Sequence, residues 1–378
     1  MRDLAPDFPI TEEVNYLNTA SIGLVPLPVK EHYLEFESRL AGGGTLTLDE
    51  ETEDLIYESL RGAASRLLGC SPDSVAVFNS VSEALNAVAW GLGVEEGRLV
   101  STALEFPSVT YPLLRMAEVR RGVEAHLVQP KGWRLPTESI LQAINEDTKA
   151  VFITHVENLT GQLNDLKAIT RRAHRVGAKV VVDGVQATGC IPVDVGELGV
   201  DAYVSGSYKY LCGPFGAAFA YFSPRLLEEL EPLYVGWRTS ENMWGLEPTH
   251  IQYPGNASRF EYSTSAYGVK LALAKSIEYL LELGVDHIHR HTQGLVRALE
   301  EELQSLGGLE QVTPPSRGSI YSFQPKALSP SELAKALKAL NRPVELSLRR
   351  GLVRLSPHIY NTEEDVAQAA QAVGRLLP

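Results

Sequence analysis

The sequence predicts an α/β fold with a mostly parallel sheet, because short β-rich apolar runs alternate with helical patterns over its first two thirds. Runs such as "KVVVDG" (179–184) are apolar nearly throughout, which is typical of strands covered by helices on both faces. The pattern then loosens over 223–262, and helices and strands alternate again on a smaller scale. These three observations predict a large domain with a helix-covered sheet and a smaller C-terminal α+β domain.

The large domain is expected to contain seven strands. They lie at 74–78, 98–102, 123–128, 149–156, 178–184, 201–206 and 216–222. Amphipathic segments at 82–91, 136–145 and 165–176 predict helices between several of them. A long helix is expected at 48–69, ended by Gly69, because glycine readily adopts the left-handed conformation found at helix ends. The carboxyl ends of the parallel strands should form the crevice that holds an active site.

The smaller domain follows the loose segment. Helices are expected near 264–283, 285–306, 330–340 and 362–377, and strands near 318–324, 344–348 and 352–356. We predict that residues 16–255 form the large domain, and that residues 1–15 and 256–378 form the small one.

Composition excludes several classes of protein. The 378 residues are 44% hydrophobic, as in soluble globular proteins, and the net charge of −13 argues against nucleic acid or an anionic membrane as a partner. Cys70, Cys190 and Cys212 lack paired or metal-type spacing, which fits a reducing compartment. The N-terminal stretch has no apolar core of a signal peptide, and no apolar run approaches the ~18 residues of a membrane span. We therefore expect a cytoplasmic protein.

Lys209 is the most unusual residue in the sequence. It lies in "DAYVSGSYKYLCGPFGAAFAYF" (201–222), with no other ionised side chain between Asp201 and Arg225. A lysine in such a place commonly extends its ammonium into water. The alternative is a desolvated amine of lowered pKa, which is the form that makes a Schiff base with a carbonyl compound.

Two further motifs supply an acid and an anion site. Asp183 ends the apolar strand "KVVVD", although an aspartate there is often only a turn or capping residue. In "FNSVSEALNAVAWG", Ser80, Val81 and Ser82 begin a helix, where they either cap it or bind an anion. An anion cradle, a carboxylate and an amine are together what pyridoxal phosphate requires.

Two other strand ends offer groups for the cofactor ring. Phe106 in "TALEFPSV" is suited to stack on the ring, although taken alone it is a core aromatic. Asn158 in "HVENLTGQLNDL" is suited to hydrogen-bond the phenolic oxygen, although taken alone it is a turn asparagine.

With these motifs in order, the chain resembles the class V aminotransferase group of fold-type I pyridoxal phosphate enzymes. That group includes cysteine desulfurases, kynureninase, cystine lyases and isopenicillin N epimerase-like proteins. The resemblance extends from "YLNTASIGLVPLPV" (16–29) to "GLVRLSPHIYNTEEDV" (351–366). It implies pyridoxal 5'-phosphate as cofactor, a small amino acid as substrate and a homodimer with sites at the interface.

The resemblance also assigns roles. Lys209 matches the Schiff-base lysine and Asp183 the partner of the pyridine nitrogen. The other positions expected to bind the cofactor are Ser80, Val81, Ser82, Phe106, Asn158, Gln186 and Tyr208. In "RFEYSTSAY", Thr264 would reach the phosphate of the neighbouring subunit. Arg354 would pair with the substrate's α-carboxylate, and Asn18, Ala20 and Ser21 would line the substrate side.

Departures from the family pattern bear on the reaction. Cysteine desulfurases carry a nucleophilic cysteine on a loop ahead of the carboxylate-binding arginine, whereas this chain has no cysteine after Cys212. Those enzymes have histidine where Tyr208 and Phe106 stand here, and "SYKYL" and "FPS" are closer to kynureninase. Ser263 replaces the usual glycine of the R-F-E-x-G-T motif.

The sequence therefore predicts aminotransferase-type chemistry and argues against a desulfurase with a loop cysteine. A C–S lyase, a kynureninase-like hydrolase and an amino-acid epimerase stay open on the same fold, as does a non-catalytic accessory protein. A nicotinamide dehydrogenase is disfavoured, because no G-x-G-x-x-G follows a first strand.

A histidine pair and a group with two tryptophans and an arginine are not assigned a role in catalysis. His287 and His291 share a helix face without a nearby carboxylate cluster, so a structural role is expected and no metal site is predicted. Trp237, Arg238 and Trp244 either shape substrate entry or pack beneath a loop.

Overall fold

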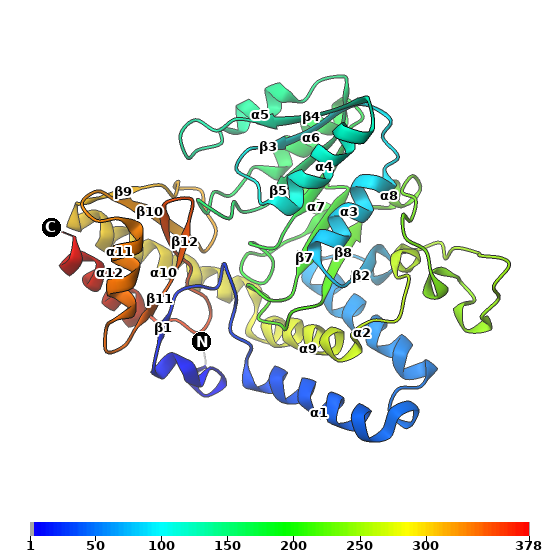
Figure 1. The fold of residues 1–378 in the computed structure, drawn as a ribbon, viewed down its shortest axis with the longest axis horizontal. Helices are drawn as coiled ribbons and strands as arrows, with labels where there is room; N and C mark the ends of the chain where they lie inside the picture. The colour runs from blue at the N-terminus through cyan, green and yellow to red at the C-terminus, as the bar shows by residue number, and fades with distance from the viewer. Residues whose placement is uncertain (1–3, 378) are drawn as a thin grey trace.

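A seven-stranded sheet of order β2–β8–β7–β6–β5–β3–β4 dominates the computed structural model, which describes residues 4–377 (Figure 1). Its strands are β2 (Val75–Phe78), β3 (Glu96–Thr102), β4 (Gly122–Val128), β5 (Thr148–Thr154), β6 (Lys179–Asp183), β7 (Ala202–Gly206) and β8 (Ala218–Phe222). Strands β3 to β7 run parallel, and β8 pairs antiparallel with both β2 and β7. The expected mostly parallel sheet is confirmed.

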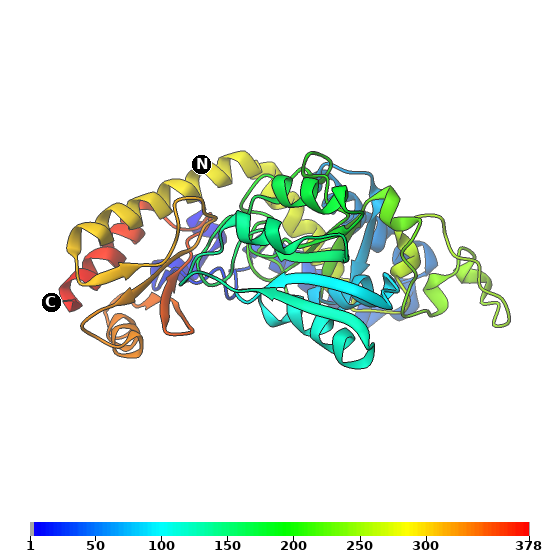
Figure 2. The same cartoon turned by 90° about the horizontal axis from the view of Figure 1, so that it is seen from above.

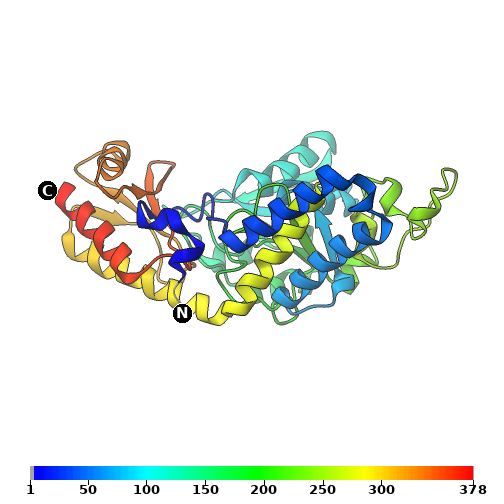
Figure 3. The same ribbon diagram turned by 90° about the horizontal axis from the view of Figure 1, so that it is seen from below.

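Helices cover both faces of this sheet (Figures 1 and 3). One face carries α3 (Val81–Gly91) and α4 (Pro107–Val119). The other carries α2 (Glu50–Leu68), α5 (Thr137–Ala143), α6 (Leu166–Arg175), α7 (Val195–Leu198) and α9 (Tyr267–Leu283), with α1 (Leu27–Gly43) packed on α9.

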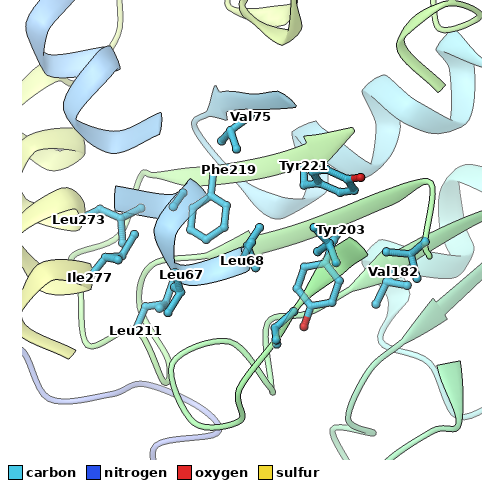
Figure 4. Close-up of a cluster of buried hydrophobic side chains, with 14 of the residues drawn as sticks. Leu67, Leu68, Val75, Val182, Tyr203, Leu211, Phe219, Tyr221, Leu273 and Ile277 are labelled. Atoms are coloured by element: carbon cyan, nitrogen blue, oxygen red, sulfur yellow. The ribbon is translucent and has the colours of Figure 1, made fainter. Parts of the chain in front are cut away.

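Consecutive strand residues alternate between the two cores, which explains why the strands are apolar without a polar face. In β6, Val180 and Val182 belong to the core under α2, α6 and α9, whereas Val181 faces α3 and α4. Tyr203 and Phe219 join the first core, where Leu67, Leu68, Leu273 and Ile277 meet them from α2 and α9 (Figure 4). Both faces of the central strands are thus closed to water.

A second, antiparallel sheet of order β12–β13–β10–β9 lies beside the first and packs on α10, α11 and α12 (Figures 1 and 2). Its strands are β9 (Leu309–Gln311), β10 (Tyr321–Pro325), β12 (Ser347–Arg349) and β13 (Leu352–Leu355). The helices are α10 (Val285–Leu306), α11 (Pro330–Lys338) and α12 (Glu363–Leu376). A short parallel pair, β1 (Asn15–Tyr16) with β11 (Val344–Glu345), ties the N-terminal segment to this part.

The structure refines several expected elements. Helix α2 ends at Gly69 with φ of +68°, as predicted, and Asp49 caps its start by accepting from the Thr52 N–H at 2.9 Å. The single strand expected at 344–348 is divided into β11 and β12, which pair with different partners. Helices α1 and α4 add to the expected set. Prolines at their starts, and Pro112 within α4, weaken their helical pattern in the sequence.

The loose segment forms α8 (Pro224–Leu227) and then a projection with only short 3₁₀ turns before α9 (Figures 1 and 2). Among the described residues, no helix has both the length and the apolar character needed to cross a membrane.

Candidate active site

A cavity of about 300 Å³ lies at the carboxyl ends of the central strands. Thr154 ends β5, Asp183 ends β6 and Gly206 ends β7, and all three line the cavity. Nine of the residues singled out in the sequence also line it: Ser80, Val81, Ser82, Phe106, Asn158, Asp183, Gln186, Tyr208 and Lys209. Because parallel strands end at one edge, groups far apart in the sequence meet there.

Lys209 lies on the loop between β7 and β8, lines the cavity and is half-buried. Its Nζ is 5.6 Å from the centre of the Phe106 ring. Burial lowers the pKa of Lys209 to about 8, the nearby Asp183 carboxylate opposes this shift, and the guanidiniums of Arg354 and Arg349 add to it. A lysine with this pKa holds far more neutral amine near pH 7 than one in water.

Asp183 is the last residue of β6 and is only 7% exposed. Its Oδ1 accepts a hydrogen bond from the Val185 N–H at 2.9 Å. Burial raises the pKa of Asp183, whereas that N–H and the Lys209 ammonium lower it. A carboxylate in this position is ready for a cationic hydrogen-bond donor, because its charge lacks solvent.

The N-terminus of α3 forms one end of the cavity. The Ser80 Oγ caps the helix by accepting from the Glu83 N–H at 3.1 Å, so the capping interpretation holds for this side chain. The Ser82 and Ser108 hydroxyls share a 2.8 Å hydrogen bond across to α4. First-turn N–H groups have no partner within a helix, so those of Val81 and Ser82 can serve an anion.

Aromatic side chains border the same cavity. Phe106 precedes α4 and is 49% exposed. Tyr208 stacks on Phe215, with ring centroids 4.4 Å apart and planes 22° from parallel. Phe215 and Ser108 were not expected in the site. Phe215 follows "SYKYL" closely and Ser108 ends "FPS", but nearness to these motifs does not by itself show that a side chain lines the cavity.

Arg354 lies next to the cavity, not on its wall. It is 2% exposed on β13, and burial lowers its pKa to about 10. Its Nη1 donates to the Asn158 carbonyl at 2.6 Å and its Nη2 to the Ser21 hydroxyl at 2.8 Å. Its Nε donates to the Ser347 hydroxyl at 2.9 Å. Arg354 is therefore fixed by neutral acceptors, and its positive charge stays available.

The N-terminal segment passes directly over Lys209. The Ala20 carbonyl accepts from the Gln186 Nε2 at 3.0 Å, and the Asn18 side chain donates to Glu345 Oε1 at 3.2 Å. The Gly23 N–H donates to the Tyr208 carbonyl at 2.8 Å. A Cβ on Gly23 would lie 2.0 Å from the Lys209 carbonyl oxygen, so only glycine permits this approach.

Thr264 does not join the cavity of its own chain. It is exposed, and its Oγ1 accepts from the Trp237 Nε1 at 3.1 Å. Arg238 is buried, pairs with Asp54 at 3.1 Å and lies 4.1 Å from the Tyr57 ring centre. Trp244 donates to the same Asp54 at 2.8 Å. These contacts favour the packing interpretation for Arg238.

The residues of the cavity fit pyridoxal phosphate. A half-buried lysine and a buried carboxylate share one cavity, a helix N-terminus and hydroxyls lie at its end, and aromatic faces border it. The Gln186 Oε1 is buried without a hydrogen-bond partner among the described residues. This combination of sheet and site is that of a fold-type I pyridoxal phosphate enzyme.

Comparison with known proteins gives the family. The chain belongs to the aminotransferase class V family, whose model matches residues 15–368. A protein named probable cysteine desulfurase from Methanothermobacter thermautotrophicus is 31% identical, over 96% of this chain and 95% of that protein. The uncharacterized aminotransferase YcbU of Bacillus subtilis is 29% identical, over 97% of this chain and 95% of that protein. The apo structure of a cysteine desulfurase from Thermococcus onnurineus NA1 matches with a TM-score of 0.89 and 25% identity, covering 100% of this chain and 98% of that one.

The segment ahead of Arg354 is a tight hairpin. Arg349 of β12 pairs with Leu352 of β13, which leaves only Arg350 and Gly351 in the turn, with φ of +49° and +82°. Two left-handed residues are typical of a type I′ turn. None of the chain's three cysteines lines the cavity.

Proposed function

We propose that this class V enzyme binds pyridoxal phosphate through Lys209 and catalyses an aminotransferase-type reaction on a small amino acid. The observation that carries the proposal is that Lys209 and Asp183 line one cavity, each close enough to shift the other's pKa. An accessory protein without activity would have no need to keep both groups desolvated.

Each cavity residue has a role in this proposal. Asp183 would hold the pyridine nitrogen, and the α3 N-terminus with Tyr208 would hold the phosphate. Phe106 would cover the ring face. Gln186 and Asn158 would hydrogen-bond the phenolic oxygen. When bound, the cofactor supplies an electron sink for the bond broken at the substrate's Cα.

The chain's own steps concern binding and proton movement. The Arg354 guanidinium, held by Ser21, Ser347 and the Asn158 carbonyl, would bind the α-carboxylate in a bidentate fashion. The Lys209 Nζ would then take the Cα proton, because its lowered pKa makes the neutral amine available. The segment around Ala20 and Ser21 would exclude water from this side.

A C–S lyase is the second candidate. Relatives named probable cysteine desulfurase favour sulfur chemistry. This chain would have to release sulfur from the substrate directly, because none of its three cysteines lines the cavity and the tight hairpin ahead of Arg354 carries none.

A second copy of the chain is proposed to complete the site. The segment before α9 exposes large apolar side chains, and so does the cavity rim at Phe106 and Phe215. The exposed residues of this segment are Leu233, Tyr234, Val235, Leu246, Ile251 and Tyr253. Exposed apolar surface of this kind marks an interaction site. In a homodimer, Thr264 would reach the phosphate of the neighbouring subunit.

Replacing Lys209 tests the cofactor assignment. Purified wild-type protein given pyridoxal phosphate should show the visible absorption of a lysine-bound cofactor, and Lys209→Ala should lack it. Lys179→Met is the control, because Lys179 is a buried lysine at the opposite end of β6 that pairs with Glu229. A band that persists in Lys209→Ala, or disappears equally in Lys179→Met, contradicts the assignment.

The reaction is distinguished by products. Holoenzyme incubated with amino acids should yield keto acid, with the amino group transferred to an added keto acid. Release of sulfide with pyruvate would instead favour the lyase. Alanine from kynurenine, or loss of chirality alone, would point to the hydrolase or the epimerase.

A further inference from the structure

Arg349 is a second guanidinium on the face of the hairpin that carries Arg354. Directly opposed residues of an antiparallel pair lie on one face, as do residues two apart on a strand. Ser347 is opposite Arg354, and Arg349 follows Ser347 by two residues. The register of β12 and β13 therefore places Arg349 and Arg354 on the same side.

The two arginines share one acceptor. The Ser21 hydroxyl accepts from Arg354 Nη2 at 2.8 Å and from Arg349 Nη2 at 3.2 Å. A hydroxyl oxygen has two lone pairs and can accept both bonds. The two guanidiniums thus come together at the N-terminal segment that borders the cavity.

Their charges are not neutralised. Within residues 4–377, neither Arg349 nor Arg354 makes an ion pair with a carboxylate, and their hydrogen-bond acceptors are hydroxyls and carbonyls. Each guanidinium also lowers the pKa of Lys209, as expected for cations near its amine. Two cations this close repel each other, and one of them, Arg354, is buried, so negatively charged groups bound at this point would be stabilised by both.

We propose that Arg349 binds an acidic group on the substrate's side chain while Arg354 binds the α-carboxylate, so that the preferred substrates are amino acids with a carboxylate side chain. This assignment rests on the proposed function and adds the substrate class to it. Arg349 is exposed, whereas Arg354 is buried. The buried and fixed guanidinium of Arg354 suits the α-carboxylate, which all amino acids share. The exposed guanidinium of Arg349 suits a side-chain carboxylate, whose distance from Cα varies.

Arg350 provides a matched control, because it is the next residue in the same turn and is also exposed. Its guanidinium lies 5.7 Å from the Trp133 ring centre, and it lowers the pKa of the buried Glu157. It makes no hydrogen bond to Ser21. Arg349→Gln and Arg350→Gln remove the same charge, and only the first removes the proposed contact.

The experiment measures equilibrium binding to holoenzyme from the change in cofactor absorption. The probes are L-aspartate and L-glutamate, with L-asparagine and L-glutamine as neutral counterparts of equal size. Wild type and Arg350→Gln should bind at least one acid about tenfold more tightly than its amide. In Arg349→Gln this preference should disappear through weaker binding of the acid, while affinity for the amide changes little. Arg349→Lys should keep part of the preference.

Three results would overturn the inference: equal affinity of wild type for acid and amide, equal weakening of both by Arg349→Gln, or an equal loss of preference in Arg350→Gln. Equal weakening of acid and amide binding would make Arg349 a second contact to the α-carboxylate. An equal loss of the acid preference in Arg350→Gln would mean that the preference comes from the overall positive charge of the turn and not from a contact with Arg349. Failure of the proposed function is distinguishable, because in that case Lys209→Ala retains the cofactor band or the wild type never acquires it.

Discussion

At the scale of single residues, the chemistry depends on the pKa of the Lys209 amine, on which burial and nearby charge have opposite effects. Desolvation favours the neutral amine, and the Asp183 carboxylate favours the ammonium. Desolvation is the larger effect, so the pKa falls to about 8. The same burial raises the pKa of Asp183, which the protonated pyridine nitrogen would offset when bound.

The pKa of Lys209 predicts the pH dependence of cofactor uptake. Only the neutral amine attacks an aldehyde, so the rate of uptake by the apo chain should rise with pH, with a midpoint near 8. Asp183→Asn removes the charge that stabilises the ammonium and should move this midpoint to lower pH. Stopped-flow absorbance with pyridoxal phosphate measures it, and an upward shift in Asp183→Asn would refute the electrostatic account.

The same substitution should separate binding from turnover. Asp183→Asn keeps the shape of the site but cannot hold a protonated ring nitrogen by charge. We expect the variant to retain cofactor and to lose about a hundredfold or more in kcat, as for other preorganised electrostatic groups. Full activity in steady-state assays would exclude this role for Asp183.

At the scale of elements, the site depends on two segments that approach from outside the large sheet. The N-terminal segment brings Gly23 against the Lys209 backbone, and the β12–β13 hairpin brings Arg354 to Ser21 of the same segment. The closeness of backbone to backbone at Gly23 fixes the first segment.

Gly23→Ala should therefore impair catalysis from outside the cavity. Its Cβ would meet the Lys209 carbonyl oxygen at 2.0 Å, so the segment must move and carry Ser21 away from Arg354. We expect the cofactor to stay bound and kcat/KM to fall tenfold to hundredfold, because a displacement of substrate-positioning groups by about 1 Å can lower the rate by up to about a hundredfold. Gly42→Ala is the control, because it lies in α1 with nothing within 4 Å of the added Cβ. Equal kinetics for the two variants would contradict this positioning role.

At the scale of the whole molecule, the predicted homodimer makes each site depend on two chains. Thr264 lies outside its own cavity, so its proposed contact needs a partner. A two-fold dimer would have two equivalent sites, and in the proposed arrangement each would combine Lys209 of one chain with Thr264 of the other.

Mixing two defective chains tests this arrangement. Lys209→Ala and Thr264→Val should each have low activity alone. After unfolding and reassembly of an equal mixture, half of the dimers should be mixed, and each mixed dimer should hold one site without either defect. Recovery of activity on mixing is the expected outcome. No recovery, although mass measurement shows mixed dimers, would place Thr264 outside the neighbouring site.

Much of the fold followed from local pattern. The apolar runs around Val181 and Tyr203 predicted buried parallel strands, because a strand covered on both faces has no polar positions. Gly69 predicted the end of α2 for an equally local reason. The division of 344–348 into two strands could not be predicted, because it depends on β1 and β13 as partners.

Local sequence was sufficient to predict the sheet class, the place of Asp183 at a strand end, the place of Asn158 after one and the apolar setting of Lys209, because these depend on residues adjacent in the chain. The resemblance placed Ser21 and Arg354 on the substrate side, but the contacts through which Arg349 and Arg354 meet at Ser21 are visible only in the folded chain. These contacts join segments more than 300 residues apart, and no local spacing encodes them. Strand register and the close approach at Gly23 are instead set by packing between elements.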